Sequence, residues 1–181
     1  MMENLSLEQM RYPIGVFKKP NEITDDLLKS WIEDIEALPT LLKKAVDSLS
    51  EEQLELPYRP EGWTLRQTVN HVADSHINAY CRFKLALTED TPTIRPYEEQ
   101  FWAELEDGKN GPIEWSLTLL EVLHKRWIVL LKSMTEEQFE RTFVHPATQQ
   151  ANSLRTVTGM YSWHGRHHTA HITELRKRLG I

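Results

Sequence analysis

The chain has 181 residues, of which 40% are hydrophobic, enough to bury a core within the usual size of one domain. Its formal net charge of -6 provides no basic surface for nucleic acid or for an anionic membrane. Because Cys81 is the only cysteine, an internal disulfide and a cluster of thiolate ligands are excluded, and any metal site must use histidine, aspartate or glutamate.

No segment of the chain predicts export or insertion into a membrane. The N-terminal sequence MMENLSLEQMRYPIG lacks a basic start followed by an apolar stretch, and no apolar run approaches the length of a membrane span. We therefore expect a single cytoplasmic domain over residues 1–181 that acts on a small-molecule substrate, with no nucleic acid and no membrane as partner.

The beginning of the chain predicts an extended arm followed by a helix. Residues 1–22 hold Pro13 and Pro20 around YPIGVFKKP, which indicates an arm laid over the domain rather than a helix. Over residues 24–46 apolar side chains recur three or four positions apart, as one buried helix face requires, and Pro39 predicts a kink.

Three further long helices are expected after the break at PYRPEGW. Thr64 is a good N-cap for a helix that runs to about residue 88. A long loop with room for one helical turn follows, and then helices over about residues 114–134 and 153–179, the last stopped by Gly180. Since no segment alternates convincingly between polar and apolar residues, the chain predicts an all-α, up-down four-helix bundle with short additional helices and essentially no sheet.

Two similar segments precede the second and the fourth of these long helices. They are LSEEQLELPYRP and MTEEQFERTFVHP. Two helical hairpins related by pseudo-symmetry would explain the likeness, but Ser/Thr-Glu-Glu-Gln is also a common helix start. The sequence alone leaves repeat and coincidence equally open.

The last helix carries four histidines within eight residues, in WHGRHHTAH. His164 and His168 lie one turn apart on the face that otherwise carries core residues, so both imidazoles can reach one ion. A lone histidine is more often a core or surface residue that hydrogen bonds satisfy. Several neutral imidazoles crowded into one seam need a shared reason, and a metal ion is the simplest.

A third ligand must come from another helix, and the second long helix offers His71 and His76. Periodicity favours His76, which lies on the apolar seam of that helix. His71 lies five residues earlier and about 140 degrees away around the helix axis. The two therefore cannot easily bind the same ion, and the spacing alone points to His76.

Five motifs spread over nearly the whole chain resemble one known family. They are YPIG at 12–15, GWTLRQ at 62–67, HVADSHINAYCRFK at 71–84, TIRPY at 93–97 and YSWHGRHHTAHITEL at 161–175. Together they are similar to the DinB-like four-helix-bundle metalloproteins, and specifically to the YfiT group of metal-dependent hydrolases. In that family the first ligand is the histidine that follows the Trp-Thr helix start, which is His71 here. The other ligands form a His-x-x-x-His pair, which matches His164 and His168.

The resemblance therefore overrules periodicity and implies that His71, His164 and His168 bind one divalent metal ion, with His167 and His171 outside the ligand set. It also implies that the ion is zinc or nickel, with water at its open positions, and that the protein is a homodimer. It implies no particular substrate, because some DinB-like relatives are thiol S-transferases or thiol-dependent isomerases, and membership of a fold does not determine the reaction.

Three neutral imidazoles leave a bound ion its full charge and at least one open position, an arrangement that acidifies bound water toward neutral pH. We therefore expect a metal-dependent hydrolase in which Asp74 or His171 moves the proton, although an aspartate such as Asp74 is more often a solvated helix residue or a residue that orients a ligand. The open position would also acidify a low-molecular-weight thiol, so a metal-dependent thiol S-transferase is the alternative. A non-catalytic metal-binding protein is the third interpretation, but a structural zinc more often has four protein ligands.

Overall fold

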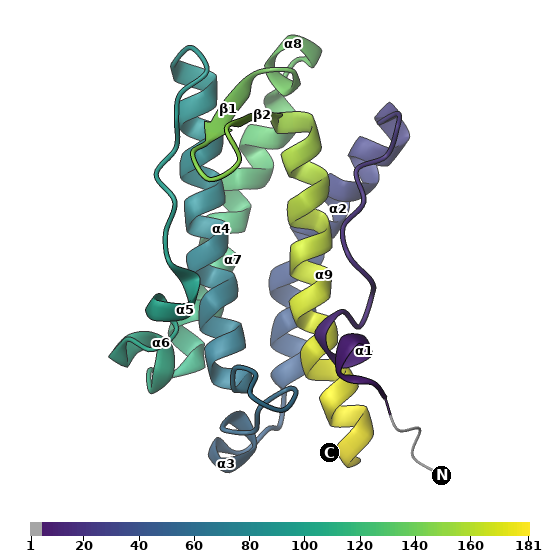
Figure 1. Cartoon of the computed structure of the whole chain (residues 1–181), viewed down its shortest axis with the longest axis vertical. Helices are drawn as coiled ribbons and strands as arrows, with labels where there is room; N and C mark the ends of the chain where they lie inside the picture. Colours follow the sequence, from purple (N-terminus) through teal and green to yellow (C-terminus); the bar gives the residue numbers. More distant parts are fainter. Residues whose placement is uncertain (1–4) are drawn as a thin grey trace.

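The computed structural model describes residues 5–181, and four long helices form the body of the molecule (Figure 1). They are α2 (Asp25–Val46), α4 (Leu65–Thr88), α7 (Ile113–Ser133) and α9 (Leu154–Leu179). Short helices precede or connect them: α1 (Leu7–Arg11), α3 (Glu51–Leu54), α5 (Glu99–Trp102), α6 (Glu106–Lys109) and α8 (Glu136–Phe139). The prediction of a four-helix bundle with short additional helices is confirmed.

Three of the four long helices begin at a side chain that caps them. Thr24, Thr64 and Ser153 each accept a hydrogen bond from the backbone N–H three residues later. Each cap satisfies an N–H that has no partner within its own helix. α9 ends at Gly180, whose φ of 69° lies in the left-handed region that glycine adopts at low cost. Local side-chain chemistry therefore sets the helix boundaries that the sequence predicts.

The directions of the helices differ from a simple up-down alternation. Contacts between α4 and α7 advance in the same direction along both helices, as in the pairs Asn70–Ser116 and Phe83–Trp127, so these helices run parallel. The reason is the connection formed by residues 89–112, which returns along the length of α4 before α7 begins (Figure 1). α4 and α7 therefore both ascend in Figure 1, while α2 and α9 both descend.

Two local elements differ from the sequence expectation. β1 (Thr142–His145) and β2 (Gln150–Ser153) form an antiparallel hairpin, where the sequence predicts essentially no sheet. Strands of four residues are too short to show a clear alternation of polar and apolar side chains. The N-terminal arm contains the helix α1, which begins at a capping box formed by Ser6 and Gln9, so the prediction of an arm without a helix is wrong there.

The two similar segments of the sequence occupy equivalent positions in the fold. α3 and α8 each begin at a capping box, formed at Ser50 and Thr135. Each segment is followed by a long helix whose second residue is an arginine, Arg66 in α4 and Arg155 in α9. Each arginine pairs with two glutamates of the preceding segment that lie one turn apart. These pairs join Arg66 to Glu51 and Glu55, and Arg155 to Glu136 and Glu140. Matching contacts at matching positions favour the repeat over coincidence.

The core consists of two apolar clusters with a layer of histidines between them. One cluster includes Phe83, Trp127 and Tyr161, and the other includes Leu120 and Ile172. His76 in α4, His124 in α7 and the histidines of α9 fall between these clusters along their helices, whereas His71 lies within the stretch of α4 that belongs to the second cluster. None of the described helices combines the length and the apolar character that crossing a membrane requires.

Close packing of α2 against α9 helps to place the histidines of α9. A Cβ atom at Gly159 would lie 2.6 Å from the Trp31 ring, and one at Gly165 would lie 2.5 Å from the Leu38 side chain. Larger residues at these positions would push the two helices apart, because a packed interior does not absorb such overlaps. Since Gly165 directly follows His164, this contact determines how far the histidines project into the bundle.

Candidate metal centre

Seven of the eight histidines gather in the middle of the bundle, and the eighth, His145, lies in β1. The seven come from three helices: His71 and His76 from α4, His124 from α7, and His164, His167, His168 and His171 from α9. Their rings contact one another both within α9, where the ring centroids of His167 and His171 lie 4.3 Å apart, and between helices, where those of His71 and His164 lie 5.4 Å apart. The contacts between long helices thus build one continuous imidazole cluster.

Three of these histidines, His71, His164 and His168, form a triad whose ligand nitrogens all lie within 4.8 Å of one another. Nε2 of His71 is 3.3 Å from Nε2 of His164. His71 and His168 are buried, whereas His164 is partly exposed, so the triad is not sealed from solvent. The structure therefore brings together the three residues that the family resemblance selects.

Burial keeps the rings of the triad neutral. It lowers the pKa of His71 to about 4, and the nearby His167 acts in the same direction. It also places the pKa of His164 and His168 well below the ordinary value for histidine, and neighbouring histidines again add to this effect. A neutral imidazole offers one nitrogen lone pair, which is the form that binds a metal ion.

The triad fits one divalent ion. A tetrahedral zinc ion with Zn–N bonds of about 2.0–2.1 Å holds two nitrogen ligands about 3.4 Å apart. The 3.3 Å separation between the Nε2 atoms of His71 and His164 agrees with this spacing. Neutral imidazoles are ligands that zinc and nickel accept readily. The residues present thus fit a divalent ion of the kind that the family resemblance implies.

His76 lies behind the triad. Its ring is fully buried, and its Nε2 lies 3.2 Å from Nδ1 of His164. It therefore contacts the ring edge of His164 that faces away from His71. Periodicity was right that His76 lies in the core of the bundle, but the residue falls outside the triad because the neighbouring ring of His164 occupies the space in front of it.

His167 and His171 form a second group with His168, and its ligand nitrogens also lie within 4.8 Å of one another. Nε2 of His171 is 3.1 Å from the carbonyl oxygen of Arg11, which the N-terminal arm supplies. His167 stacks on Trp163, with ring centroids 4.4 Å apart, and its Nδ1 is buried without a hydrogen-bond partner. His168 belongs to both groups. An ion bound by one group and an ion bound by the other would therefore need the same ring.

Polar side chains line the triad on the side of α4. The hydroxyl of Ser75 is 3.4 Å from Nε2 of His164. Burial raises the pKa of Tyr97, and the charge of Asp74 adds to this increase. A hydrogen bond from Ser75 lowers the pKa of Tyr97 and so opposes it. Burial also raises the pKa of Asp74 to about 6, with a further contribution from Asp107. A carboxyl group with a raised pKa thus follows the candidate ligand His71 by three residues in α4.

Arg82 is a buried cation without an acidic partner. The residue is 9% exposed, and its Nε is buried without a hydrogen-bond partner. None of the ion pairs formed within residues 5–181 includes Arg82. Arg82 and Ser75 contact the hydroxyl of Tyr161 and oppose the rise in its pKa that burial causes. Since buried charges are normally paired, Arg82 is suited to receive an anion.

Trp63 covers the triad from the start of α4. Its ring centroid is 4.5 Å from that of His71 and 6.5 Å from that of His168. The loop that carries Trp63 is held by a backbone hydrogen bond from Tyr58 N–H to the Trp63 carbonyl. Trp63 thus forms part of the wall around the triad.

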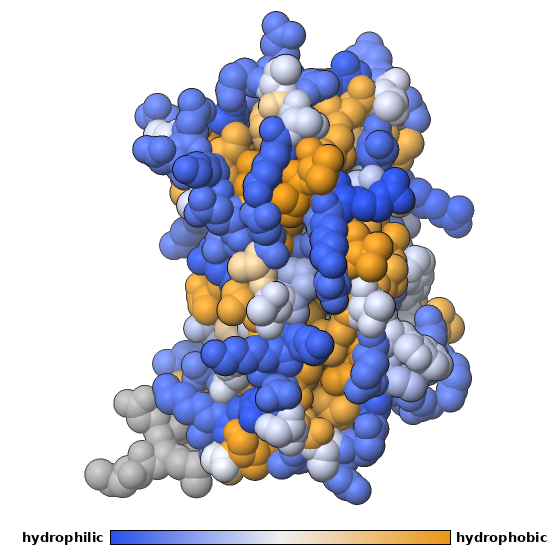
Figure 2. Space-filling view, turned by 180° about the vertical axis from the view of Figure 1, so that it is seen from behind, coloured by the Kyte–Doolittle hydropathy of each residue, from blue (hydrophilic) through white to orange (hydrophobic). Residues whose placement is uncertain are grey.

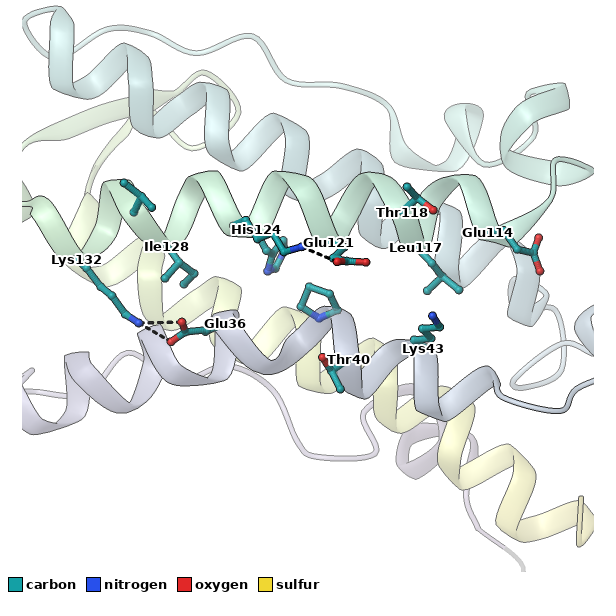
Figure 3. A pocket seen from close by; sticks show the side chains of 13 residues that line it. Glu36, Thr40, Lys43, Glu114, Leu117, Thr118, Glu121, His124, Ile128 and Lys132 are labelled. Carbon is teal, nitrogen blue, oxygen red and sulfur yellow. Dashed lines mark hydrogen bonds and ion pairs between the residues drawn. The ribbon is translucent and has the colours of Figure 1, made fainter.

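A groove lies elsewhere on the described surface, between α2 and α7 (Figure 3). Its volume is about 980 Å³, and charged side chains such as Glu36 and Lys132 line its walls. His124 reaches this groove from α7 but is only 2% exposed. The triad does not line the groove, so we do not assign the chemistry to it.

The sequence analysis did not identify several residues in and around the histidine cluster as candidates. His124, Ser75, Tyr97 and Tyr161 were not among the candidates, although His124 does lie on the apolar face of α7. A histidine at core spacing on a third helix is the one signal that could have drawn attention to it. Ser75, Tyr97 and Tyr161 carry no such signal, because serine and tyrosine are common at half-buried positions.

The chain is similar to known proteins over most of its length. Residues 34–172 match the family model of the DinB superfamily. The chain is 55% identical over 173 residues to proteins of Bacillus cereus strain 03BB102 and Bacillus anthracis strain CDC 684, both named "Putative metal-dependent hydrolase". Each of these alignments covers 96% of this chain and 99% of the relative.

A solved structure shows the same arrangement of helices. YfiT from Bacillus subtilis, described as a probable metal-dependent hydrolase with an unusual four-helix bundle topology, matches with a TM-score of 0.93 at 49% identity. The match covers 95% of this chain and 98% of that protein. The fold, the histidine-rich layer and the extent of the sequence match lead to one conclusion: the chain belongs to the DinB superfamily.

Proposed function

We propose that the protein is a metal-dependent hydrolase in which His71, His164 and His168 hold one zinc or nickel ion. The observation that carries this proposal is the convergence of three neutral imidazole nitrogens. A divalent ion bound there supplies Lewis-acid chemistry, which polarises a substrate oxygen and lowers the pKa of water. The names of the relatives support the same activity.

Asp74 is the residue that we assign to proton transfer. With a pKa of about 6, its carboxylate accepts a proton from an attacking water molecule near neutral pH and returns it to the leaving group. His171, the other candidate, faces His168 with Nδ1 and the Arg11 carbonyl with Nε2. Because both of its ring nitrogens are engaged, His171 is less suited to exchange protons with a substrate.

Arg82 indicates the chemical class of the substrate. A buried guanidinium without an acidic partner lowers the free energy of a carboxylate or phosphate group that binds next to it. Tyr161 links Arg82 to the triad, because its ring centroid lies 5.6 Å from that of His164. We therefore expect the hydrolysed ester or amide to carry an anionic group.

The test is turnover of a panel of anionic and neutral esters and amides by zinc-loaded and nickel-loaded protein, with and without a small thiol. We expect hydrolysis without thiol, faster turnover of anionic members and loss of activity on chelation. Arg82→Met should raise KM for anionic members by about tenfold or more, since a hydrogen bond to a charged group contributes about 1.5–3 kcal/mol. KM for neutral members should not change.

Two results would contradict these assignments. Turnover that requires the thiol and yields a thioether would reject hydrolysis in favour of thiol transfer. An Arg82→Met variant that retains the preference for anionic members would show that Arg82 does not contact the substrate.

We also propose that the protein is a homodimer that pairs through the outer face of α7. Four exposed apolar residues follow this face at coiled-coil spacing: Trp115, Leu119, Val122 and Val129, with exposed fractions of 67%, 44%, 54% and 71%. Hydrophobic residues are visible between hydrophilic ones on the face seen from behind (Figure 2). A second copy related by a two-fold axis would cover the same stripe on both chains.

Light scattering coupled to size-exclusion chromatography tests the dimer. We expect the wild-type protein to have the mass of two chains, and the double variant Val122→Glu with Val129→Glu to have the mass of one, because charges cannot be buried in that contact. Phe101→Glu is the control, since Phe101 is 69% exposed in α5, away from the stripe. A monomeric wild-type protein, or a dimer that the α7 variant leaves intact, would contradict the proposal.

A further inference from the structure

Pro39 lies inside α2 and leaves one backbone carbonyl of that helix without its usual partner. In an α-helix the carbonyl of residue i accepts a hydrogen bond from the N–H of residue i+4, and proline has no N–H. The carbonyl of Ile35 therefore receives no bond from position 39. Instead, His124 of α7 donates its Nδ1–H to this oxygen across the helix interface, at 2.6 Å.

This hydrogen bond determines which ring nitrogen carries the proton on His124, and through it on His76 and then on His164. Because a carbonyl only accepts, Nδ1 of His124 carries the hydrogen and Nε2 of the neutral ring must accept. Nδ1 of His76 therefore donates to Nε2 of His124, at 3.0 Å. By the same argument Nδ1 of His164 donates to Nε2 of His76, at 3.2 Å. The lone pair of His164 then lies on Nε2, the atom that faces His71.

The other α9 ligand is oriented by a similar but shorter chain. His171 donates its Nε2–H to the carbonyl oxygen of Arg11, at 3.1 Å. Its Nδ1 must then accept from Nδ1 of His168, which lies 3.4 Å away. The lone pair of His168 is left on Nε2. Both histidines of the His-x-x-x-His pair are thus held in the same tautomer by chains that end on a backbone carbonyl.

We infer that His76 and His124 are positioning residues for the metal site, and that Pro39 contributes to the site by freeing the Ile35 carbonyl on which their chain of hydrogen bonds ends. This inference rests on the proposed function, because it concerns the same ion. A partner on the second ring nitrogen fixes the orientation of a ligating histidine, and losing such a partner typically weakens metal binding by about 10–100-fold.

Pro39→Ala is the sharpest test, because stability and metal affinity should change in opposite directions. Alanine restores an N–H that competes with His124 for the Ile35 carbonyl, so the dissociation constant for zinc should rise by about tenfold, at the lower end of the range for such partners. Removing a proline from a helix interior should leave the thermal unfolding midpoint of the metal-free protein unchanged or raise it. An unchanged or lower dissociation constant would overturn the inference.

A double-mutant cycle separates the chain of imidazoles from a general change in α2. His124→Leu should weaken zinc binding by about 10–100-fold, and His124→Gln should restore much of the loss, because its amide can both donate and accept. In the His124→Leu background, Pro39→Ala should have no further effect on zinc affinity. Equal effects of Pro39→Ala in both backgrounds would show that Pro39 does not act through His124.

Nuclear magnetic resonance gives a readout that does not depend on activity. In zinc-loaded protein labelled with ¹⁵N, the rings of His76, His124 and His164 should all carry the proton on Nδ1. A proton on Nε2 of His164 would overturn the inference, even if zinc is bound. Loss of zinc from the ligand variant His164→Ala tests the proposed function separately, so a failure of the site and a failure of the positioning chain give different results.

Discussion

Replacing His164 by alanine is expected to weaken zinc binding by more than about 100-fold, beyond the usual effect of losing a residue that only orients a ligand. The variant leaves two imidazoles, and water must take the place of the third. Competition with a chromogenic chelator measures the dissociation constant. His145→Ala is the matched control, because His145 is the histidine outside the cluster. The His145→Ala protein should bind zinc with the affinity of the wild type.

The corresponding variants of α4 decide between the family resemblance and periodicity. His71→Ala should lose as much affinity as His164→Ala, because His71 faces the same point from the opposite helix. His76→Ala should lose only about 10–100-fold, since it removes the hydrogen-bond partner of a ligand and not the ligand itself. Full zinc affinity in His71→Ala, with complete loss in His76→Ala, would show that the ligand set is wrong.

Asp74→Asn is expected to lower kcat by about 10²–10⁴-fold, the usual contribution of a positioned general base, while zinc binding stays intact. In the wild type, kcat/KM should rise with pH through about 6, where the Asp74 carboxyl loses its proton. The variant should lack this rise. An equal pH dependence in both proteins would assign the proton transfer to another group. Asp26→Asn, at an exposed position in α2, is the control.

The stability of the Asp74→Asn variant should change in the opposite direction to its activity. Burial raises the pKa of Asp74 in the folded state above its value in the unfolded chain, so its contribution to stability is present below about pH 4 and is lost as the pH rises through about 6. At pH 7 the neutral asparagine should therefore unfold at the same or a higher temperature. A large loss of both activity and stability would indicate a structural role instead.

Much of the fold could be predicted because its signals are local. Apolar residues at helical spacing, together with caps such as Thr64 and the stop at Gly180, determine where the long helices lie. The directions of α4 and α7 could not be predicted, since the course of residues 89–112 depends on contacts that no local pattern encodes. The hairpin β1–β2 was missed for a related reason, because its strands are short.

The candidate site could be predicted only in part. The pair His164 and His168 follows from helical spacing, but choosing His71 over His76 required the family resemblance, because periodicity detects burial and not the direction of a ring. The role inferred for His124 depends on a carbonyl in α2 that Pro39 leaves free. The sequence shows the proline as a kink and carries no sign of its distant partner.

The most direct test of the metal site is anomalous X-ray diffraction at the zinc absorption edge from crystals of zinc-loaded protein. We predict one ordered peak per chain, within bonding distance of Nε2 of His71, His164 and His168. A peak among His167, His168 and His171, or no peak in the histidine cluster, would contradict the account.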